Sequence, residues 1–463
     1  MDFIFGGITA LVALYALGKW RDAMYGAILL DALRDPVRKI SALQSSITTV
    51  IVAVVWFAAL IGSQHQDQRE MRLLFQRYPR LRNSVVLLLV SLIPGLLVST
   101  LFYENGWLLA SIGVVSYTAP FLGVALGYLW PRRLQDVYRW MAMYCVVNSV
   151  MALGSLFEVY GMDFPGLGGM NMKWLRNYGT DMIPLICGFY RSPDVMGIHA
   201  AHVIMFASLL AIRLRNRNPW PWIGLVAWEG FSLLVCGRRK MIAIPLVFLV
   251  SSFALWAIMN GRKKIAISMA LMVTVAISFM AILSEGVVAD NEYTRFASSI
   301  ASEGVDRAGR SLTDNVFTTI RQSGLFGDGL GTVTQGRQYM GVVTRGHDWQ
   351  EDGVGRLVKE LGIPGTICIL WSVWLLISSL WSALQAIPAN SPMSTLQFGL
   401  FGIIVANAAS FSVSHQAYSG DPSTVLMVGF FAGMILGMPR AFWSEVTPIT
   451  PSAPTEQNVV VAS

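Results

Sequence analysis

The stretch Ser84–Tyr103, SVVLLLVSLIPGLLVSTLFY, decides the class of fold, because it contains no charged side chain. An α-helix rises about 1.5 Å per residue, so a run of about 20 apolar residues crosses the ~30 Å hydrocarbon core of a bilayer. The stretch therefore predicts a transmembrane helix.

Runs of the same kind recur along the chain. Hydrophobic residues make up 54% of the sequence and charged residues 13%, roughly half the charged fraction of a soluble domain. We therefore expect an all-α polytopic membrane protein with about twelve transmembrane helices. The N-terminal run lacks the basic residues of a signal peptide, so we expect a membrane helix there. The predicted segments are 3–18, 44–64, 84–103, 107–130, 138–158, 198–213, 220–236, 241–260, 264–284, 361–383, 396–413 and 423–440.

Basic residues in the short loops predict which side of the membrane each loop faces. Positively charged loops stay in the cytoplasm. We therefore expect four alternate basic loops, and with them both termini, to be cytoplasmic. These loops contain Arg69–Arg82, Arg132–Arg139, Arg213–Arg217 and Arg262–Lys264.

A weak apolar run, Ala23–Leu33, does not fit this pattern. It is too short to span a membrane, and Arg34, Arg38 and Lys39 follow it on the side expected to be external. We therefore expect an interfacial or half-inserted helix.

The predicted topology divides the chain into four parts. Residues 1–284 would hold the first nine helices, 285–360 a large external loop, and 361–443 the last three helices. Residues 444–463 are polar and rich in proline, threonine and serine, so we expect a disordered cytoplasmic tail.

Charge and cysteine content argue against some functions. The formal net charge is +7. In a membrane protein, positive charges in the loops set the orientation of the protein in the membrane, so this charge does not indicate nucleic-acid binding. The cysteine spacing matches neither a disulfide framework nor a zinc site. We therefore predict no metal and no cofactor. The four cysteines are Cys145, Cys187, Cys236 and Cys368.

The predicted external loop, 285–360, carries seven arginines. Arginine binds phosphate or carboxylate through two parallel hydrogen bonds. The loop also contains a glycine run, Gly324–Gly331 (GLFGDGLG), which follows no clear strand. We expect it to form a turn after a short helix over 312–321, because a phosphate-binding loop would follow a strand. A solvated charged loop without chemistry is the alternative interpretation.

Basic side chains from separate parts of the chain are expected at the external face. Several guanidinium groups can bind a diphosphate and neutralise the charge that develops as it leaves. A histidine can accept the proton of an attacking sugar hydroxyl. The pattern predicts glycosyl transfer from a lipid diphosphate, where the loop folds back over the outer ends of segments 198–213, 220–236 and 241–260. The residues are Arg191, Arg238, Arg239, Arg310 and His347.

Four short motifs follow one another in the second half of the chain. They are Tyr190-Arg-Ser-Pro-Asp194, Leu234-Val-Cys-Gly-Arg-Arg-Lys-Met241, Gly309-Arg310 followed by Ser323–Gly331, and His347-Asp348 followed by Leu357–Gly365. In order and spacing they resemble the O-antigen ligase and polymerase family, which acts on undecaprenyl-diphosphate-linked sugars. The resemblance covers residues 185–385. It implies a GT-C-like glycosyltransferase architecture in the bacterial inner membrane, with a periplasmic active site.

The resemblance implies roles for several candidate residues. Catalytic residues would be His347, Arg310 and Arg191, with Arg238 or Arg239 supporting them in binding the substrate. Apart from the resemblance, Arg321 and Arg345 are further candidates for binding the diphosphate. The chain differs from the family in having Asp348 where asparagine is common, and in a longer spacing after His347. The base is therefore either His347 or a carboxylate, and the candidate carboxylates are Glu351, Asp352 and Glu360.

We expect a polymerase of O-antigen or exopolysaccharide. It would transfer a growing glycan from undecaprenyl diphosphate to the sugar end of another lipid-linked repeat unit. Expected partners are that lipid-linked oligosaccharide, membrane lipids, and a flippase and chain-length regulator of the same pathway. Two alternatives stay open: a ligase with a lipid or protein acceptor, and a transporter of lipid-linked sugars. A transporter would carry polar residues near the bilayer midplane, where the predicted segments carry few.

Overall fold

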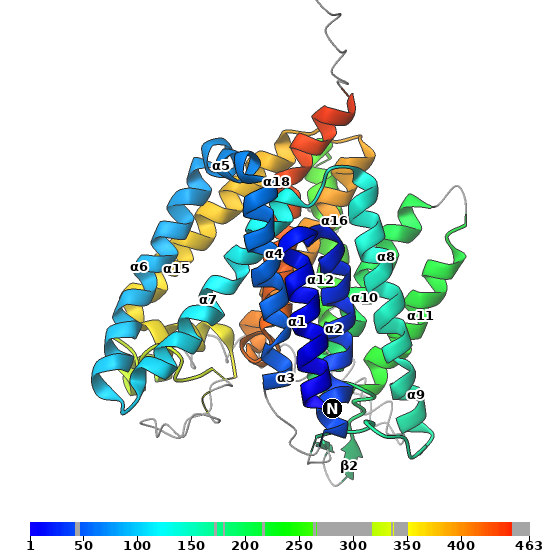
Figure 1. Ribbon diagram of the computed structural model, residues 1–463, viewed down its shortest axis with the longest axis vertical. Helices are drawn as coiled ribbons and strands as arrows, with labels where there is room; N and C mark the ends of the chain where they lie inside the picture. Colours follow the sequence, from blue (N-terminus) through cyan, green and yellow to red (C-terminus); the bar gives the residue numbers. More distant parts are fainter. Residues whose placement is uncertain are drawn as a thin grey trace, which may run out of the picture.

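Helices form nearly all of the part of the chain that the computed structural model describes (Figure 1). The fold is thus of the all-α polytopic membrane class that the sequence predicts. The described residues are 1–41, 47–170, 174–178, 181–214, 218–262, 265, 317–334, 337 and 351–446.

The helices run up and down between two ends of one bundle (Figure 1). In chain order they are α1 (Asp2–Gly18), α2 (Trp20–Ile40), α3 (Ile47–Val50), α4 (Val52–Gln66), α5 (Gln68–Arg77), α6 (Pro79–Phe102), α7 (Gly106–Leu129), α8 (Leu134–Met151), α9 (Leu153–Val159), α10 (Pro193–Arg213), α11 (Trp220–Val235), α12 (Arg239–Met259), α15 (Gly353–Gln385), α16 (Pro392–Val413), α17 (Gln416–Ser419) and α18 (Pro422–Val446). An antiparallel hairpin, β1 (Leu175–Tyr178) and β2 (Asp181–Pro184), lies between α9 and α10 and adds a small sheet that the sequence did not predict.

Most of the predicted transmembrane segments are present as helices. Within the described ranges, nine helical stretches are long and apolar enough to cross a membrane, and α1 and α11 are shorter apolar helices. Together they account for eleven of the twelve predicted segments. The remaining segment, 264–284, lies outside the described residues apart from residue 265.

Helix α2 is longer than the helix expected over Ala23–Leu33. It is continuous for 21 residues. At about 1.5 Å per residue it is about 30 Å long, enough to cross the hydrocarbon core. It packs against α1, α4 and α8 over the height of the bundle (Figure 1). Its charged residues lower the mean hydropathy of α2, so a hydropathy profile does not identify the helix. Three of these residues, Arg34, Asp35 and Arg38, are nevertheless buried.

The additional helix places the two ends of the described chain at opposite ends of the bundle (Figure 1). Asp2 accepts a hydrogen bond from Ser41, where α2 has just ended. Arg440, near the end of α18, pairs with Glu70 of α5 at 3.0 Å. The expectation that both termini face the cytoplasm would instead place the two ends of the chain on one side of the membrane.

The predicted cytoplasmic loops do gather at one end of the bundle, beside α5. Arg132 pairs with Asp67 at 3.3 Å, which joins the α7–α8 loop to the α4–α5 junction. The guanidinium of Arg213, at the end of α10, lies 4.0 Å from the ring centroid of Tyr138, in the first turns of α8. We call this the α5 end, and the other the α2 end, after the C-terminus of α2.

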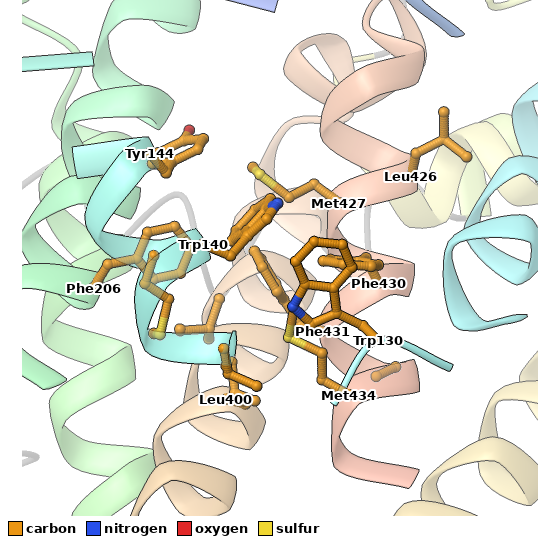
Figure 2. Packing of buried hydrophobic residues seen from close by; sticks show 14 of the residues in the cluster. Trp130, Trp140, Tyr144, Phe206, Leu400, Leu426, Met427, Phe430, Phe431 and Met434 are labelled. Carbon is orange, nitrogen blue, oxygen red and sulfur yellow. The ribbon is translucent and has the colours of Figure 1, made fainter. Parts of the chain in front are cut away.

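Aromatic side chains from several helices meet in the centre of the bundle (Figure 2). Trp140 of α8 lies 5.3 Å from Phe430 of α18 and 6.0 Å from Phe206 of α10, between ring centroids. Trp130, directly after α7, contacts Phe430 edge-on at 5.6 Å. Lipid supplies no hydrophobic force between helices, so close packing of this kind holds a membrane bundle together.

Glycines bring α7 and α18 into backbone contact. A Cβ atom added to Gly433 would overlap the carbonyl oxygen of Val124, and one added to Gly127 would overlap that of Phe430. Small residues at helix interfaces in membranes allow this close approach.

Gly433→Ala is therefore expected to destabilise the protein by about 1–3 kcal/mol through overpacking. The melting temperature of the purified protein in detergent measures the effect. Gly224→Ala is the matched control, because a Cβ at this helical site meets no atom within 4 Å. The control should be neutral or stabilising, since alanine favours helix more than glycine does. Equal melting temperatures for the two variants would contradict the close contact of α7 with α18.

Candidate functional site

The turn Tyr190–Asp194 begins α10 at the α2 end of the bundle. Ser192 is the N-cap of α10, and its hydroxyl accepts a hydrogen bond from the Val195 amide at 3.4 Å. Pro193 occupies the first turn, where its missing N–H costs nothing. The motif thus fixes a helix start, with the charged side chains of Arg191 and Asp194 on either side of the cap.

Arg191 is held by two buried carboxylates. Its guanidinium pairs with Asp35 of α2 at 3.2 Å and with Asp421, directly before α18, at 3.1 Å. The Arg191 amide also donates to Asp35 at 3.1 Å. One predicted catalytic residue therefore joins α2, α10 and α18.

Asp421 is ionised by its surroundings. Burial alone would raise the pKa of this carboxyl, but the guanidinium groups of Arg34 and Arg191 outweigh burial and hold the pKa below its usual range. The other carboxylate oxygen accepts hydrogen bonds from the Ser423 and Thr424 amides, at 3.1 and 3.3 Å, in the first turn of α18. Negative charge is favourable at a helix N-terminus, so Asp421 both caps α18 and binds the two arginines.

Arg34 extends the ion pairs of Asp421 further into the bundle. It pairs with Asp421 and, at 3.0 Å, with Asp31 one turn earlier on α2. It also donates to the Ser423 hydroxyl at 3.1 Å. Arg38, one turn later, donates to the Thr49 hydroxyl at 3.1 Å. A charged stripe of α2 therefore has protein partners inside the bundle.

Asp194, in the same turn, forms ion pairs with two basic side chains. Arg238 lies 3.1 Å and Lys240 lies 2.8 Å from its carboxylate oxygens. Lys240 also donates to the Ser414 hydroxyl at 2.7 Å. The guanidinium of Arg238 lies 5.5 Å from the ring centroid of Trp174. The α11–α12 turn is thus tied to α10; the backbone of Arg239 begins α12, and its side chain lies outside the described atoms.

Lys39 adds a cation on the other side of Arg191. It donates to the Gly188 carbonyl at 2.9 Å. The amides of Cys187 and Gly188 donate to Glu158 at 2.9 and 2.7 Å, which fixes the loop before Arg191. Burial raises the pKa of the Cys187 thiol to about 12, so this cysteine is a neutral thiol and no nucleophile at neutral pH.

We define the cationic rim as Lys39, Arg191, Arg238 and Lys240. The carboxylates that pair with these residues lie inside the bundle, with Asp421 fully buried. The cations are partly exposed: 13% of the Arg191 side chain, 24% of Arg238 and 19% of Lys240. The carboxylates are thus more deeply buried than the basic side chains that pair with them. This arrangement can bind a multiply charged anion such as a diphosphate.

Three of the predicted residues lie outside the described residues: Arg310, Arg345 and His347. Of the three candidate carboxylates, Asp352 is the N-cap of α15 and accepts a hydrogen bond from the Gly355 amide. Glu351 is exposed, and its carbonyl accepts from the His415 amide at 3.0 Å. His415 follows Ser414, which Lys240 contacts, so Glu351 lies on the rim side of the bundle.

Glu360, another candidate base, is held in the fold by hydrogen bonds to its carboxylate. It is fully buried and accepts hydrogen bonds from Tyr117 at 2.8 Å and from Arg356 at 3.1 Å. Its other oxygen accepts from the Val333 amide at 3.0 Å and the Thr334 hydroxyl at 3.1 Å. A carboxylate with four donors thus joins α7, α15 and the chain after the glycine run.

The described part of the large loop packs where it was not expected. Residues 317–323 are helical and the glycine run follows as a turn, as predicted. The run enters between α6 and α7: the Leu330 amide donates to Gly95 at 2.9 Å, and Ser99 donates to the Leu330 carbonyl at 2.7 Å. A Cβ on Gly331, at φ +85°, would overlap the Leu109 carbonyl. Residues 317–334 thus pack on α6, α7 and α15, and not over α10–α12.

Arg321 belongs to this second region. Its side chain is exposed on the helix 317–323, beside α6 and not at the cationic rim. Among the described residues, no group of three or more histidine, cysteine, aspartate or glutamate side chains is placed to hold a metal ion.

The sequence analysis missed the acidic half of the site. Asp31, Arg34, Asp35 and Arg38 follow the spacing i, i+3, i+4, i+7, which places them on one helix face. A helix of spanning length with such a charged stripe needs partners in a membrane protein. That stripe was the available signal, whereas nothing local marks Asp421 as the partner.

Comparison with known proteins does not assign the chain to a family. No protein-family model matches the chain, and no curated protein matches it. The functional assignment therefore rests on the residues and contacts described above.

Asp421→Asn is expected to destabilise the protein by about 3–5 kcal/mol, because it removes the buried carboxylate that Arg34 and Arg191 share. Thermal unfolding in detergent measures the loss. Asp163→Asn, at an exposed position, is the control and should change stability by less than about 0.5 kcal/mol. An Asp421→Asn protein that melts with the control would show that this ion-pair network is not formed.

Proposed function

We propose that this protein is a membrane glycosyltransferase that polymerises lipid-linked repeat units into a bacterial polysaccharide, an O-antigen or exopolysaccharide. Its donor would be a glycan on undecaprenyl diphosphate. The single observation that supports this most is the cationic rim, which gathers partly exposed cations from α2, α10 and α12 at one end of the bundle.

The rim suits the leaving group of this reaction. The side chains of Arg238 and Lys240 are partly exposed, and both pair with Asp194. Preorganised cations that face a developing negative charge stabilise a transition state without reorganising at that moment. The diphosphate would lie across Arg191, Arg238 and Lys240, with Arg310 as a further ligand from the loop.

The chemistry needs one bond formed and one broken. The hydroxyl oxygen of the acceptor sugar attacks the anomeric carbon of the donor glycan. The bond from that carbon to the diphosphate oxygen breaks, and undecaprenyl diphosphate leaves with the electron pair. The hydroxyl proton passes to a base, for which His347 is the first candidate. Glu351 is the second, because Asp352 and Glu360 serve the fold.

The distribution of the basic loops predicts which end of the bundle faces the cytoplasm. The α5 end would face the cytoplasm, because it collects the basic loops. The α2 end would then be periplasmic, with the N-terminus and the cationic rim. An inner-membrane location suits a lipid-diphosphate substrate presented on the periplasmic surface.

The proposal is tested by extending a synthetic undecaprenyl-diphosphate repeat unit with purified protein. The wild type should form polymer, with and without a chelator. Arg238→Gln should reduce turnover by about 100-fold or more, as expected when one transition-state donor is lost. Arg238 is suited to this test because Lys240 remains as a partner of the buried Asp194 after the replacement.

The matched control is Arg139→Gln, an exposed arginine in α8 near the α5 end. It should leave turnover unchanged. Absence of any polymer with the wild type, or full activity of Arg238→Gln, would contradict the proposal. Transfer of preformed polymer to a lipid or protein acceptor, without extension of repeat units, would instead identify a ligase.

Transport of a lipid-linked sugar is the second candidate, favoured by one observation. Asp31 and Arg34 lie within α2, and polar groups within membrane helices are typical of transporters. Their partners are other protein side chains, which is the arrangement of a structural network. Movement of a labelled lipid-linked sugar across proteoliposome membranes, without formation of a longer glycan, would favour transport.

A further inference from the structure

A second concave site lies apart from the cationic rim, between the end of α6, the chain 322–328 and α15. Its volume is about 580 Å³, within the range of about 300–1,000 Å³ that is usual for ligand pockets. Phe102 and Tyr103 line one side and Phe326 lines another. Asp328 and Lys359 provide charged groups, and we call this site the α6 groove.

The groove has a floor fixed by backbone hydrogen bonds. The Asp328 amide donates to the Lys359 carbonyl at 2.7 Å, and the Ile363 amide donates to the Leu325 carbonyl at 2.9 Å. Gly327, at φ +75°, lies so close to α15 that a Cβ would contact the Lys359 carbonyl at 2.6 Å. The chain that lines the groove is therefore held on α15 before any ligand arrives.

The walls combine exposed aromatic rings with a charged pair. Phe102 is 59% and Phe326 is 57% exposed. Lys359 is only 5% exposed, and its ammonium lies 3.8 Å from the Asp328 carboxylate, a long ion pair. The Ser323 hydroxyl donates to the same carboxylate at 3.3 Å. The groove thus offers flat apolar surfaces next to hydrogen-bonding groups of both signs.

This combination suits a sugar ring better than a lipid chain. A pyranose has an apolar C–H face, which stacks on an aromatic ring, and a rim of hydroxyls, which bond to carboxylate and ammonium groups. A hydrocarbon chain would cover the partly exposed Asp328 and offer it no hydrogen-bond donor, at an unfavourable free energy. The groove also lies at the α2 end of the bundle, because α6 begins beside α18 at the α5 end and runs away from it (Figure 1).

We propose that the α6 groove binds a saccharide, namely the sugar end of the acceptor, while the cationic rim holds the donor diphosphate. The role as acceptor site rests on the proposed function. The saccharide binding itself rests only on the lining of the groove.

The probe is the repeat-unit oligosaccharide of the host's surface polymer, on a short alkyl chain with a fluorophore and without a diphosphate. It can accept a glycan but cannot donate one. Direct binding to protein in nanodiscs gives Kd, and extension with the lipid-linked donor gives KM and kcat. Phe326→Ala and, separately, Phe102→Ala should each raise Kd and KM about tenfold, the loss expected for one aromatic contact, with little change in kcat.

Phe317→Ala is the matched control. Phe317 is 66% exposed and lies on the helix that precedes the groove, but it does not line it. It should leave Kd and KM unchanged. Because Phe326 is already exposed, its replacement should not unfold the protein, and the melting temperature checks this.

The outcomes separate the two proposals. If the wild type binds the probe, both groove variants weaken binding and no polymer forms, the saccharide site stands and the proposed function fails. If polymer forms but the groove variants keep the wild-type Kd and KM, the groove proposal fails and the function stands. If the wild type does not bind the probe, or if labelled phospholipid displaces it from the groove, the saccharide site is overturned.

Discussion

The charges on α2 have to be paired inside a membrane bundle, and the rest of the structure depends on this constraint. Arg34 is fully buried, and an isolated charge at such a position is strongly unfavourable. Asp31 on the same helix and Asp421 before α18 supply the opposite charge. Because Asp421 also binds Arg191 and caps α18, the pairing of α2 fixes where α10 and α18 begin.

The same pairing prepares the candidate site. Arg191 cannot turn freely, since Asp35 and Asp421 hold both ends of its guanidinium. Asp194, three residues later, holds Arg238 and Lys240 in the same way. Buried carboxylates thus position partly exposed cations, and the order that a diphosphate would need exists before binding. The α6 groove has its own rigid floor, so donor and acceptor sites would be separate elements of one bundle end.

Much of the fold was predictable because hydropathy is a local property. Ser84–Tyr103 predicts a helix without knowledge of its neighbours, and the structure has α6 there. α2 was not predictable in this way, because the partner of Arg34 stands 387 residues further along the chain. Arg191 was found through its external position before a helix, whereas the carboxylates that hold it were not. The hydrogen bonds that hold Glu360 could not be predicted, since its donors from α7 and from the chain after the glycine run are brought together only in the folded chain.

We propose that α2 crosses the membrane with its charges paired inside the bundle. The most direct measurement locates both ends of the chain in intact cells. Single cysteines at Phe3 and at Val446, both exposed, are introduced into a chain whose four native cysteines are replaced. A membrane-impermeant maleimide should label position 3 in intact cells and position 446 only after permeabilisation. Labelling of both positions under the same condition would place the termini on one side and contradict the account.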